Sequence, residues 1–570
     1  MRQFMGQLMK SRGRATLFLG VILTGSAVIY IWAITTNGFG YYHDDGIYVT
    51  LAKSLATGQG YRIISLPGEP VETKSPPVYP FLLSLVWRLY PSFPQNLIPI
   101  MLLSAGAAMA SLALAWLYLQ RRGYASSWDA LLIVGLMALN WRTVVLASGV
   151  YSEMFYTALS VGALYLTEEH EDRHEDRQER WTTGLAAGLV LGLAFLTRTS
   201  GIALVVAVGA YFCLRRKFRV AVVPLGMASV FIFGWIGWCY LNRTHEHGVN
   251  AGYHESYFQT LALVISQAQG SVHSSVLTII SGMIAKNFLM LVPVSIPIVC
   301  LGLSYAWPRS FGTGGQVFGL VLFIIVLIFT VAGFFRLRAR FGALKLMQVY
   351  VVIYLILQVL WPYSGYDRFL MPLLPFLSLF LISGFARPVN LVRKELSQGS
   401  IANKISAAFV ALMLTILVGA SLSAYCYGLY GSVFKLRRVW VTRALEDRAA
   451  IQWLNANTDA SDVLVCYRDP AYYLYTGRKA TRCSPLRTGG ITTPQADDLE
   501  EQAKTVFKII EENNARYLIL TSTDMALEDR ADLYRTTYNA LLDKHPEIFV
   551  PVFTSTSGAT VYRIDDRSAR

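Results

Sequence analysis

The chain has 570 residues, of which 54% are hydrophobic and 15% are charged, and its mean hydropathy is +0.42. Soluble globular proteins carry about 25% charged residues, so this composition excludes an ordinary soluble protein and indicates an integral membrane protein. The formal net charge is +14. The basic residues gather in short loops between apolar segments, so this charge does not indicate binding to nucleic acid.

Apolar segments recur along the chain, and most approach the length of about 20 residues that is needed to cross the hydrocarbon core of a bilayer. They lie at 17–34, 97–119, 130–147, 150–166, 182–197, 200–214, 220–240, 287–306, 316–335, 344–360, 368–385 and 405–426. The pattern therefore predicts a mainly α-helical, polytopic transmembrane bundle of about 11–13 spans.

The basic loops predict the orientation of the chain in the membrane. Basic clusters lie before the first span, at Arg121–Arg122 and at 215–219. When the spans are counted from a cytoplasmic N-terminus, all three clusters fall on the cytoplasmic side, as the positive-inside rule requires. Counting back from Arg387 disagrees with this count by one crossing between Leu241 and Arg336. We therefore predict one additional or re-entrant segment within 257–285 and an external C-terminus.

The first external loop, 37–95, carries an unusual pair of carboxylates, Asp44 and Asp45. The apolar spacing from Asp45 to Gly58 predicts an amphipathic helix on the membrane surface. Asp is a favoured N-cap, but a cap needs one carboxylate, and a second one beside lipid has a desolvation cost. A second short apolar helix is predicted at 78–89, so two interfacial helices flank Glu72 and Lys74.

Two segments contain residue types that bind metals. His170 and His174 have one-turn spacing, and His245, Glu246, His247, His254 and Glu255 are close together in the second external segment. Neither spacing is diagnostic of a metal site, so solvated loops are the favoured interpretation. Of the six cysteines, Cys466 and Cys483 lie in the external tail, where a disulfide is chemically permitted.

After residue 428 the composition becomes that of a soluble domain. Strands are predicted in "DVLVCYRDPAYYLYTG" and "ARYLILTS", helices in "DDLEEQAKTVFKIIEENN" and "MALEDRADLYRTTYNALLDKH", and a hairpin in "VPVFTSTSGATVYRI". We therefore expect a transmembrane domain over 1–427 and a small extracytoplasmic α/β domain over 428–570. This domain is expected to act as a lid or docking platform. Its candidate contacts with an acceptor are Lys504, Lys508, Tyr472, Tyr473 and Tyr475, although burial in a small domain explains the tyrosines equally well.

Several motifs in order resemble those of one enzyme family. They are the Asp-Asp pair after the first span, the K-S-P-P-x-Y-P turn at 74–80, "SGVYSEMFYTALSVGALYL", "GLAFLTRTSGIALV" and "YDRFLMPLLPFLSL". Over residues 14–430 the chain resembles the GT-C membrane glycosyltransferases, in particular the bacterial protein O-mannosyltransferase and aminoarabinose transferase group. The aminoarabinose transferases have an Arg where this chain has Ile47, which argues against their substrate.

The resemblance implies inverting transfer of a monosaccharide from a polyprenyl-phosphate donor to a lipid, glycan or protein acceptor at the outer face. Asp44 matches the catalytic carboxylate of the family, and Asp45 is the alternative base or orients the acceptor. A carboxylate can accept the proton of an attacking hydroxyl. Some relatives use a divalent metal ion, so metal dependence is left open and no other cofactor is expected.

The departing lipid phosphate requires cations, and an Arg fork binds phosphate bidentately. The external candidates are Lys74, Arg198 and Arg368, with a membrane anchor as the alternative interpretation of Arg198. Glu153 matches an acidic position of the family and could hold such a cation. Tyr363 and Tyr366 could stack on a sugar, although interfacial aromatic residues more often form a membrane belt. The expected substrate-binding residues are thus Glu72, Lys74, Glu153, Arg198, Tyr363, Tyr366 and Arg368.

These expectations place the protein in a bacterial inner membrane, with its N-terminus cytoplasmic and its C-terminal domain periplasmic. Its expected partners are the polyprenyl-linked donor, the acceptor and membrane lipids. A polytopic transporter or lipid flippase is the main alternative, but such proteins show internal repeats and charges at mid-membrane depth. A non-catalytic scaffold is the other alternative. The identities of the sugar and the acceptor are not encoded in any motif of the chain.

Overall fold

The computed structural model describes residues 2–40, 43–172, 177–243, 276–301, 312–361, 366–398, 400–482, 499–521 and 531–565. The chain forms two compact units. The first comprises Met1–Ile34, Leu102–Phe233 and Gly282–Lys435, and the second comprises Thr35–Met101, Gly234–Ser281 and Leu436–Arg570. The second unit thus combines the first external loop with the C-terminal part of the chain.

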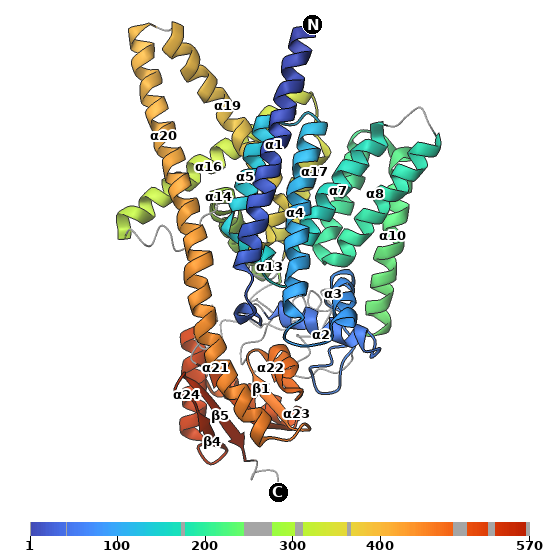
Figure 1. Cartoon of the computed structure of the whole chain (residues 1–570), viewed down its shortest axis with the longest axis vertical. Coiled ribbons are helices and arrows are strands. Elements are labelled where there is room, and N and C mark those ends of the chain that lie inside the picture. The colour runs from blue at the N-terminus through green and yellow to red at the C-terminus, as the bar shows by residue number, and fades with distance from the viewer. Residues whose placement is uncertain are drawn as a thin grey trace. The chain divides into compact units, whose positions relative to one another are not determined.

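The first unit is helical, and each predicted span overlaps at least one described helix (Figure 1). Residues 302–306 of the predicted span 287–306 lie outside the described residues. The helices are α1 Arg2–Ala33, α4 Leu97–Arg121, α5 Ser127–Leu139, α6 Trp141–Ala147, α7 Glu153–Asp172, α8 Arg177–Thr197, α9 Ile202–Leu214, α10 Phe218–Leu241, α13 Val276–Met290, α14 Ile296–Leu301, α16 Gly312–Phe341, α17 Leu346–Val359, α18 Tyr366–Phe369, α19 Leu374–Gln398 and α20 Ile401–Tyr430. Helix α10 extends past this unit, and α4 and α13 begin before it. The additional segment predicted within 257–285 falls largely outside the described residues.

Seven of the described helices are long and apolar enough to cross a bilayer, or eight if the bent pair of α5 and α6 is one span. Predicted spans that coincide with α9 and α17 are shorter apolar helices, of 13 and 14 residues. The chain is therefore an integral membrane protein with a polytopic helical bundle.

A sharp bend separates α5 from α6, and Asn140 lies at the bend. The axes of the two helices differ by 63°. The Asn140 side chain accepts a hydrogen bond from the backbone N–H of Arg142 at 3.0 Å, which caps α6, and donates to the carbonyl of Val299 at 2.9 Å. This cap begins a new helix at Trp141 and fixes the start of α6, where Arg142 lies.

The second unit contains α2 Asp44–Ala56 and α3 Val78–Leu89, at the positions where short helices are predicted. The C-terminal part contributes α21 Leu436–Asn457, β1 Val463–Cys466, α22 Asp469–Thr476, β2 Ala480–Arg482, α23 Leu499–Glu512, β3 Ala515–Thr521, α24 Ala531–Lys544, β4 Phe549–Thr554 and β5 Ala559–Ile564. The strands form one mixed sheet in the order β2-β1-β3-β5-β4. The predicted α/β fold of the C-terminal part is therefore confirmed, whereas the expected boundary between residues 427 and 428 stays a prediction.

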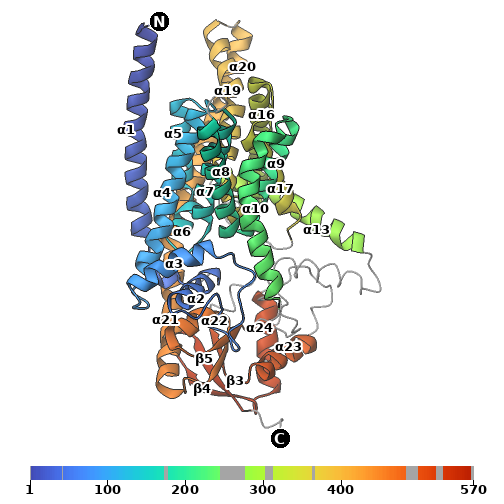
Figure 2. The same cartoon turned by 90° about the vertical axis from the view of Figure 1, so that its right-hand side faces the viewer.

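Helices cover both faces of this sheet (Figure 2). Val465 and Leu518 pack in one cluster with residues of α23 and α24, whereas their chain neighbours Leu464 and Ile519 pack with α21. Successive side chains of a strand point to opposite faces, so the apolar runs of β1 and β3 supply both cores.

One predicted strand is wrong in its second half. The stretch "DVLVCYRDPAYYLYTG" forms β1 only over Val463–Cys466 and then turns into helix α22. Pro470 lies in the first turn of α22, where backbone N–H groups make no bond within the helix, so a proline costs nothing there. Gly477 ends the helix with a left-handed backbone (φ 76°). Proline disfavours a central strand for the same reason, since it cannot donate to the ladder.

Helices α16 and α19 cross with their backbones in close approach. A Cβ atom built on Gly333 would lie 1.7 Å from the carbonyl oxygen of Phe380, and one on Gly384 would lie 2.0 Å from that of Phe329. Both obstacles are backbone atoms, so no side-chain rotation removes them. The crossing therefore requires glycine at both positions.

We predict that Gly333→Ala lowers the thermal unfolding temperature of the detergent-solubilised protein, with a loss of about 1–3 kcal/mol from overpacking. The matched control is Gly20→Ala in α1, where an added Cβ meets nothing within 4 Å. Because alanine is the better helix former, the control should be neutral or slightly stabilising. Equal losses in both variants would contradict the close crossing.

Candidate active site

The candidate residues fall into two groups, one in each unit. In the first unit, Glu153 lies at the N-terminus of α7 with a side chain that is 1% exposed. Its Oε1 atom pairs with Nη1 of Arg198 at 2.9 Å and also with Nε of Arg368. Arg198 additionally donates a hydrogen bond to Oγ of Ser152 at 2.9 Å. Glu153, Arg198 and Arg368 were predicted from separate motifs, and the carboxylate of Glu153 contacts both arginines.

A second ion pair, between Arg142 and Asp367, belongs to the same group and was missed at the sequence level. Arg142 Nη2 pairs with Asp367 Oδ2, and Oδ1 of Asp367 accepts a hydrogen bond from the backbone N–H of Arg368 at 2.9 Å. A signal for Arg142 was available, because an ionisable residue inside a predicted span is a candidate functional residue by default. We call Arg142, Glu153, Arg198, Asp367 and Arg368 the arginine cluster.

Aromatic rings lie beside all three guanidinium groups of the arginine cluster. The Arg142 guanidinium is 4.0 Å from the ring centre of Trp141, that of Arg198 is 5.6 Å from Phe369, and that of Arg368 is 5.4 Å from Tyr151. Such contacts hold the planar groups in fixed orientations. Tyr366 is the first residue of α18, and Tyr363 lies outside the described residues.

The arginine cluster contains three arginines and two carboxylates, so it has an excess of one positive charge. The three arginine side chains are only 11–15% exposed. Charges that are removed from water must be paired inside the protein, and each of the three guanidinium groups pairs with a carboxylate of the cluster. Arginine forks in this state bind a phosphate oxyanion well, because each fork can donate two parallel hydrogen bonds.

In the second unit, the two adjacent aspartates have different surroundings. Asp45 is 1% exposed, and its Oδ2 accepts from the N–H of Gly40 at 2.7 Å while Oδ1 accepts from the N–H of Gly46 at 2.9 Å. It therefore folds the turn into α2. Asp44, the first residue of α2, is half-buried. The backbone amides of the first helical turn favour a negative charge at this position.

The residue before Asp44 joins this loop to the C-terminal part of the same unit. His43 has a left-handed backbone (φ 65°), which is unfavourable for a residue with a side chain. Its Nε2 atom is 2.9 Å from Oδ1 of the fully buried Asp469, at the start of α22. A Cβ on Gly46 would lie 3.0 Å from Pro470, so the start of α2 also packs closely on α22.

Glu72 and Lys74 lie in the loop between α2 and α3. Glu72 is 1% exposed, and its Oε1 accepts from the backbone N–H groups of Lys74 and, at 2.8 Å, of Ser75. Burial raises the pKa of this carboxyl above its ordinary value. Its backbone carbonyl accepts a hydrogen bond from Trp238 at 3.0 Å. These contacts give Glu72 a role in folding the loop, and Lys74 is half-buried beside it.

Among the described residues, no group of three His, Cys, Asp or Glu side chains is arranged to hold a metal ion. His170 is buried and its two ring nitrogens bond to the carbonyls of Arg180 and Val220. His174, Cys483 and the 245–255 segment lie outside the described residues. Asp45 uses both carboxylate oxygens on backbone amides, Asp44 is the more exposed carboxylate of the pair, and metal dependence stays a prediction.

We predict that Asp45→Asn destabilises the protein by about 2–3 kcal/mol, because the amide replaces one acceptor with a donor that faces a backbone N–H. Asp44→Asn is the matched control and should cost less than about 1 kcal/mol. Thermal unfolding in detergent, followed by intrinsic fluorescence, measures both. Equal losses would contradict the division between a folding carboxylate and an accessible one.

We predict that Glu153→Ala is strongly destabilising, by about 3–5 kcal/mol, because it leaves two buried guanidinium groups without their shared carboxylate. Glu169→Ala, on the same helix but 28% exposed, should cost about 1 kcal/mol or less. In a double-mutant cycle, adding Arg368→Met to Glu153→Ala should cost less than Arg368→Met alone. Strict additivity would contradict the shared pairing.

Comparisons with known proteins agree with this architecture. Residues 74–238 match the family model described as dolichyl-phosphate-mannose-protein mannosyltransferase. At the level of sequence, no curated protein matches the chain. The structure is similar to that of apo ArnT from Cupriavidus metallidurans, with a TM-score of 0.51 and 13% identity over 97% of this chain and 98% of that chain.

The structure is also similar to the oligosaccharyltransferase of Archaeoglobus fulgidus. The complex of that enzyme with Zn and sulfate gives a TM-score of 0.53 and 13% identity over 95% of this chain and 72% of that chain. The form tethered to an acceptor peptide gives 0.51 and 13% over 96% and 74%. The resemblance to the GT-C glycosyltransferases, predicted from the motifs, is therefore confirmed, and the chain has the GT-C fold over nearly its whole length.

Proposed function

We propose that the protein is a membrane glycosyltransferase that moves a monosaccharide from a polyprenyl-phosphate donor to a hydroxyl of a lipid, glycan or protein acceptor. Whether that sugar is a hexose or a pentose is left to the experiment. We place the reaction at the outer face of a bacterial inner membrane, with the N-terminus in the cytoplasm. The basic loops support this orientation through the positive-inside rule.

The arginine cluster is the observation that carries the proposal. A phosphate that leaves from a glycosidic bond gains negative charge as the bond breaks, and preorganised cations stabilise that charge most strongly where water is largely excluded. Arg142, Arg198 and Arg368 meet both conditions, since their side chains are largely buried and their orientation is fixed by carboxylates and aromatic rings. We assign them to the donor phosphate, with Lys74 as a further predicted cation.

Asp44 is proposed as the general base. A hydroxyl is a poor nucleophile until a positioned group accepts its proton. Asp45 is committed to the amides of Gly40 and Gly46, whereas Asp44 is half-buried at the N-terminus of α2. The acceptor oxygen attacks the anomeric carbon, the proton passes to Asp44, and the electron pair of the broken bond goes to the lipid phosphate. One displacement of this kind inverts the anomeric centre.

The names of the matching proteins support the donor and acceptor classes. The matching family model is named for a dolichyl-phosphate mannose donor and a protein acceptor, and the Archaeoglobus enzyme was solved with an acceptor peptide tethered to it. A lipid-linked sugar donor suits a protein whose helices lie in the bilayer. We extend the donor class, a polyprenyl-phosphate sugar, to this chain and leave the acceptor class open among lipid, glycan and protein.

The test is sugar transfer by the purified full-length protein in lipid, offered a panel of polyprenyl-phosphate monosaccharides with membrane extract as the acceptor. We expect transfer from one donor, and a loss of about 10²–10⁴-fold in kcat for Asp44→Asn, the usual contribution of a general base. Arg368→Gln should also lose activity. Asp543→Asn, at an exposed position of α24, is the matched control and should keep it.

Each variant is first checked to be folded at the assay temperature, so that loss of activity is not loss of fold. Undiminished transfer by Asp44→Asn would remove this residue as the base while leaving the enzyme class intact. No transfer from any donor, together with movement of lipid or solute across the bilayer, would overturn the glycosyltransferase proposal in favour of a transporter or flippase.

A further inference from the structure

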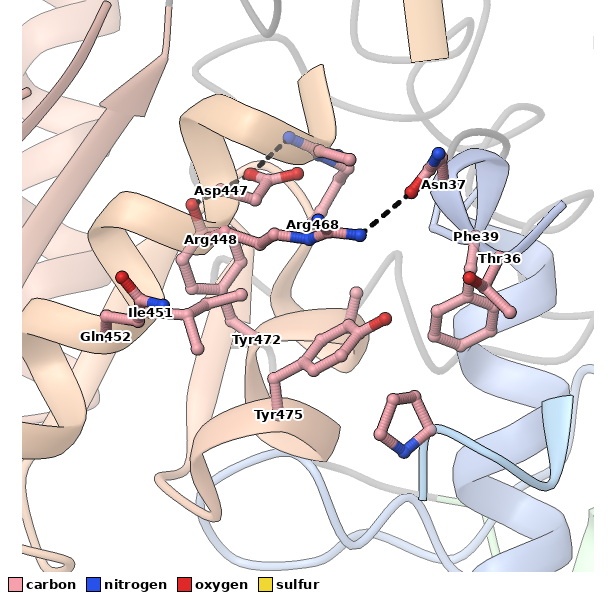
Figure 3. A pocket seen from close by; sticks show the side chains of 13 residues that line it. Thr36, Asn37, Phe39, Asp447, Arg448, Ile451, Gln452, Arg468, Tyr472 and Tyr475 are labelled. Atoms are coloured by element: carbon pink, nitrogen blue, oxygen red, sulfur yellow. Dashed lines mark hydrogen bonds and ion pairs between the residues drawn. The ribbon is translucent and has the colours of Figure 1, made fainter. Parts of the chain in front are cut away.

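A cavity of about 160 Å³ lies in the second unit (Figure 3). Its lining includes none of the residues that we assign to the donor. Thr36, Asn37, Phe39 and Pro94 of the first external loop line it from one side, and residues of α21 and α22 line it from the other. This volume equals that of about five liquid water molecules. It is too small for the drug-sized ligands that fill larger pockets and suits one compact molecule.

Charged side chains form one part of the cavity wall. Arg468 pairs with Oδ1 of Asp447, and the Tyr472 hydroxyl donates to the same oxygen at 3.0 Å. Arg448 Nη2 donates instead to the neutral side-chain carbonyl of Asn37 at 3.1 Å. Of the two arginines in the described lining, Arg448 is exposed and bonds to a neutral partner, so it is the group that can take an anion.

Aromatic and apolar side chains form the rest of the wall. In Figure 3 the Tyr475 ring lies on one side of the opening and Phe39 lies on the other. The ring of Phe93 packs edge-on against Tyr475 at 4.8 Å, which restricts its rotation. Burial, followed by the nearby Asp447, raises the pKa of Tyr475 to about 12, so its hydroxyl remains a donor at neutral pH.

Planar polar groups beside aromatic rings match the two kinds of surface that a sugar presents. Ring C–H groups of a pyranose pack on an aromatic face, while its hydroxyls bond to arginine, amide and carboxylate groups at the edge. A purely hydrophobic ligand would not use the exposed Arg448 guanidinium, and a bare inorganic anion would leave Tyr475 and Phe39 without contact. The combination selects a small ligand that has both an apolar ring face and a negative charge.

We propose that this cavity binds a single sugar unit that carries an acidic group. We assign that unit to the acceptor, so the acceptor is a glycan or glycolipid with an acidic sugar. This second step rests on the proposed glycosyltransferase function, whereas binding of the sugar does not. Arg448 takes the acidic group, and the Tyr475 ring takes the apolar face.

The test is equilibrium binding to the full-length protein in lipid nanodiscs, by saturation-transfer NMR and calorimetry, with glucuronate, glucose and inorganic phosphate as probes. We expect glucuronate to bind more tightly than glucose and phosphate to bind least. Arg448→Gln should weaken glucuronate by about tenfold and leave glucose unchanged, because it removes the charge and keeps an amide for Asn37. Tyr475→Leu should weaken both sugars.

The matched control is Arg438→Gln, an exposed arginine on the same helix α21, which should leave all three affinities unchanged. Phosphate binding as tight as glucuronate would overturn the sugar site in favour of a simple anion site. So would an absence of glucuronate binding, or binding that Arg448→Gln and Tyr475→Leu do not alter.

The transfer assay separates failure of this proposal from failure of the proposed function. If the protein transfers sugar, Arg448→Gln should raise the KM for the acceptor and leave kcat unchanged. Transfer without glucuronate binding would overturn the cavity assignment alone. Glucuronate binding without any transfer would keep the cavity and overturn the enzyme. A free acidic sugar and a glycolipid are distinguished by offering each as the acceptor.

Discussion

The central constraint on this protein is that charged side chains must be buried in a chain that is mostly apolar. Glu153 meets it by serving two arginines with one carboxylate oxygen, and Asp367 serves a third. Glu153 begins α7, Arg142 lies in α6, Arg198 follows α8, and Asp367 and Arg368 are neighbours in α18. Three elements therefore place these charged side chains: the bend at Asn140, the start of α7 and the short α18. Within the arginine cluster itself, three guanidinium groups meet two carboxylates.

Local sequence was sufficient to predict most of the fold. Twelve apolar segments gave twelve helical regions, because a backbone inside a bilayer must satisfy its own hydrogen bonds. The two short helices of the first external loop and the C-terminal α/β domain followed from the spacing of apolar residues. The exception was α22. Its tyrosines and leucine resemble a strand in composition, and only Pro470 and Gly477 indicate a helix with defined ends.

The site was predictable only in part. Glu153, Arg198 and Arg368 were chosen separately, as ionisable residues at the outer ends of spans, and their shared ion pairs could not be read from the sequence. Arg142 was not predicted as a site residue, because it lies inside an apolar segment and the apolar pattern does not show the bend at Asn140. His43 and Asp469 are 426 residues apart, and no local pattern links them. Long-range pairs of this kind are decided by tertiary packing rather than by propensity.

The link between His43 and Asp469 has a consequence for how the protein is made. Ribosomes add about 5–20 residues per second, so the interval between the synthesis of these two residues is about 20–85 s. Throughout that time the turn before α2 lacks the partner that stabilises its left-handed residue. The loop bearing Asp44 therefore completes its native structure only after the C-terminal segment has been synthesised. A nascent or prematurely terminated chain is in this way kept from presenting its candidate base in the native position.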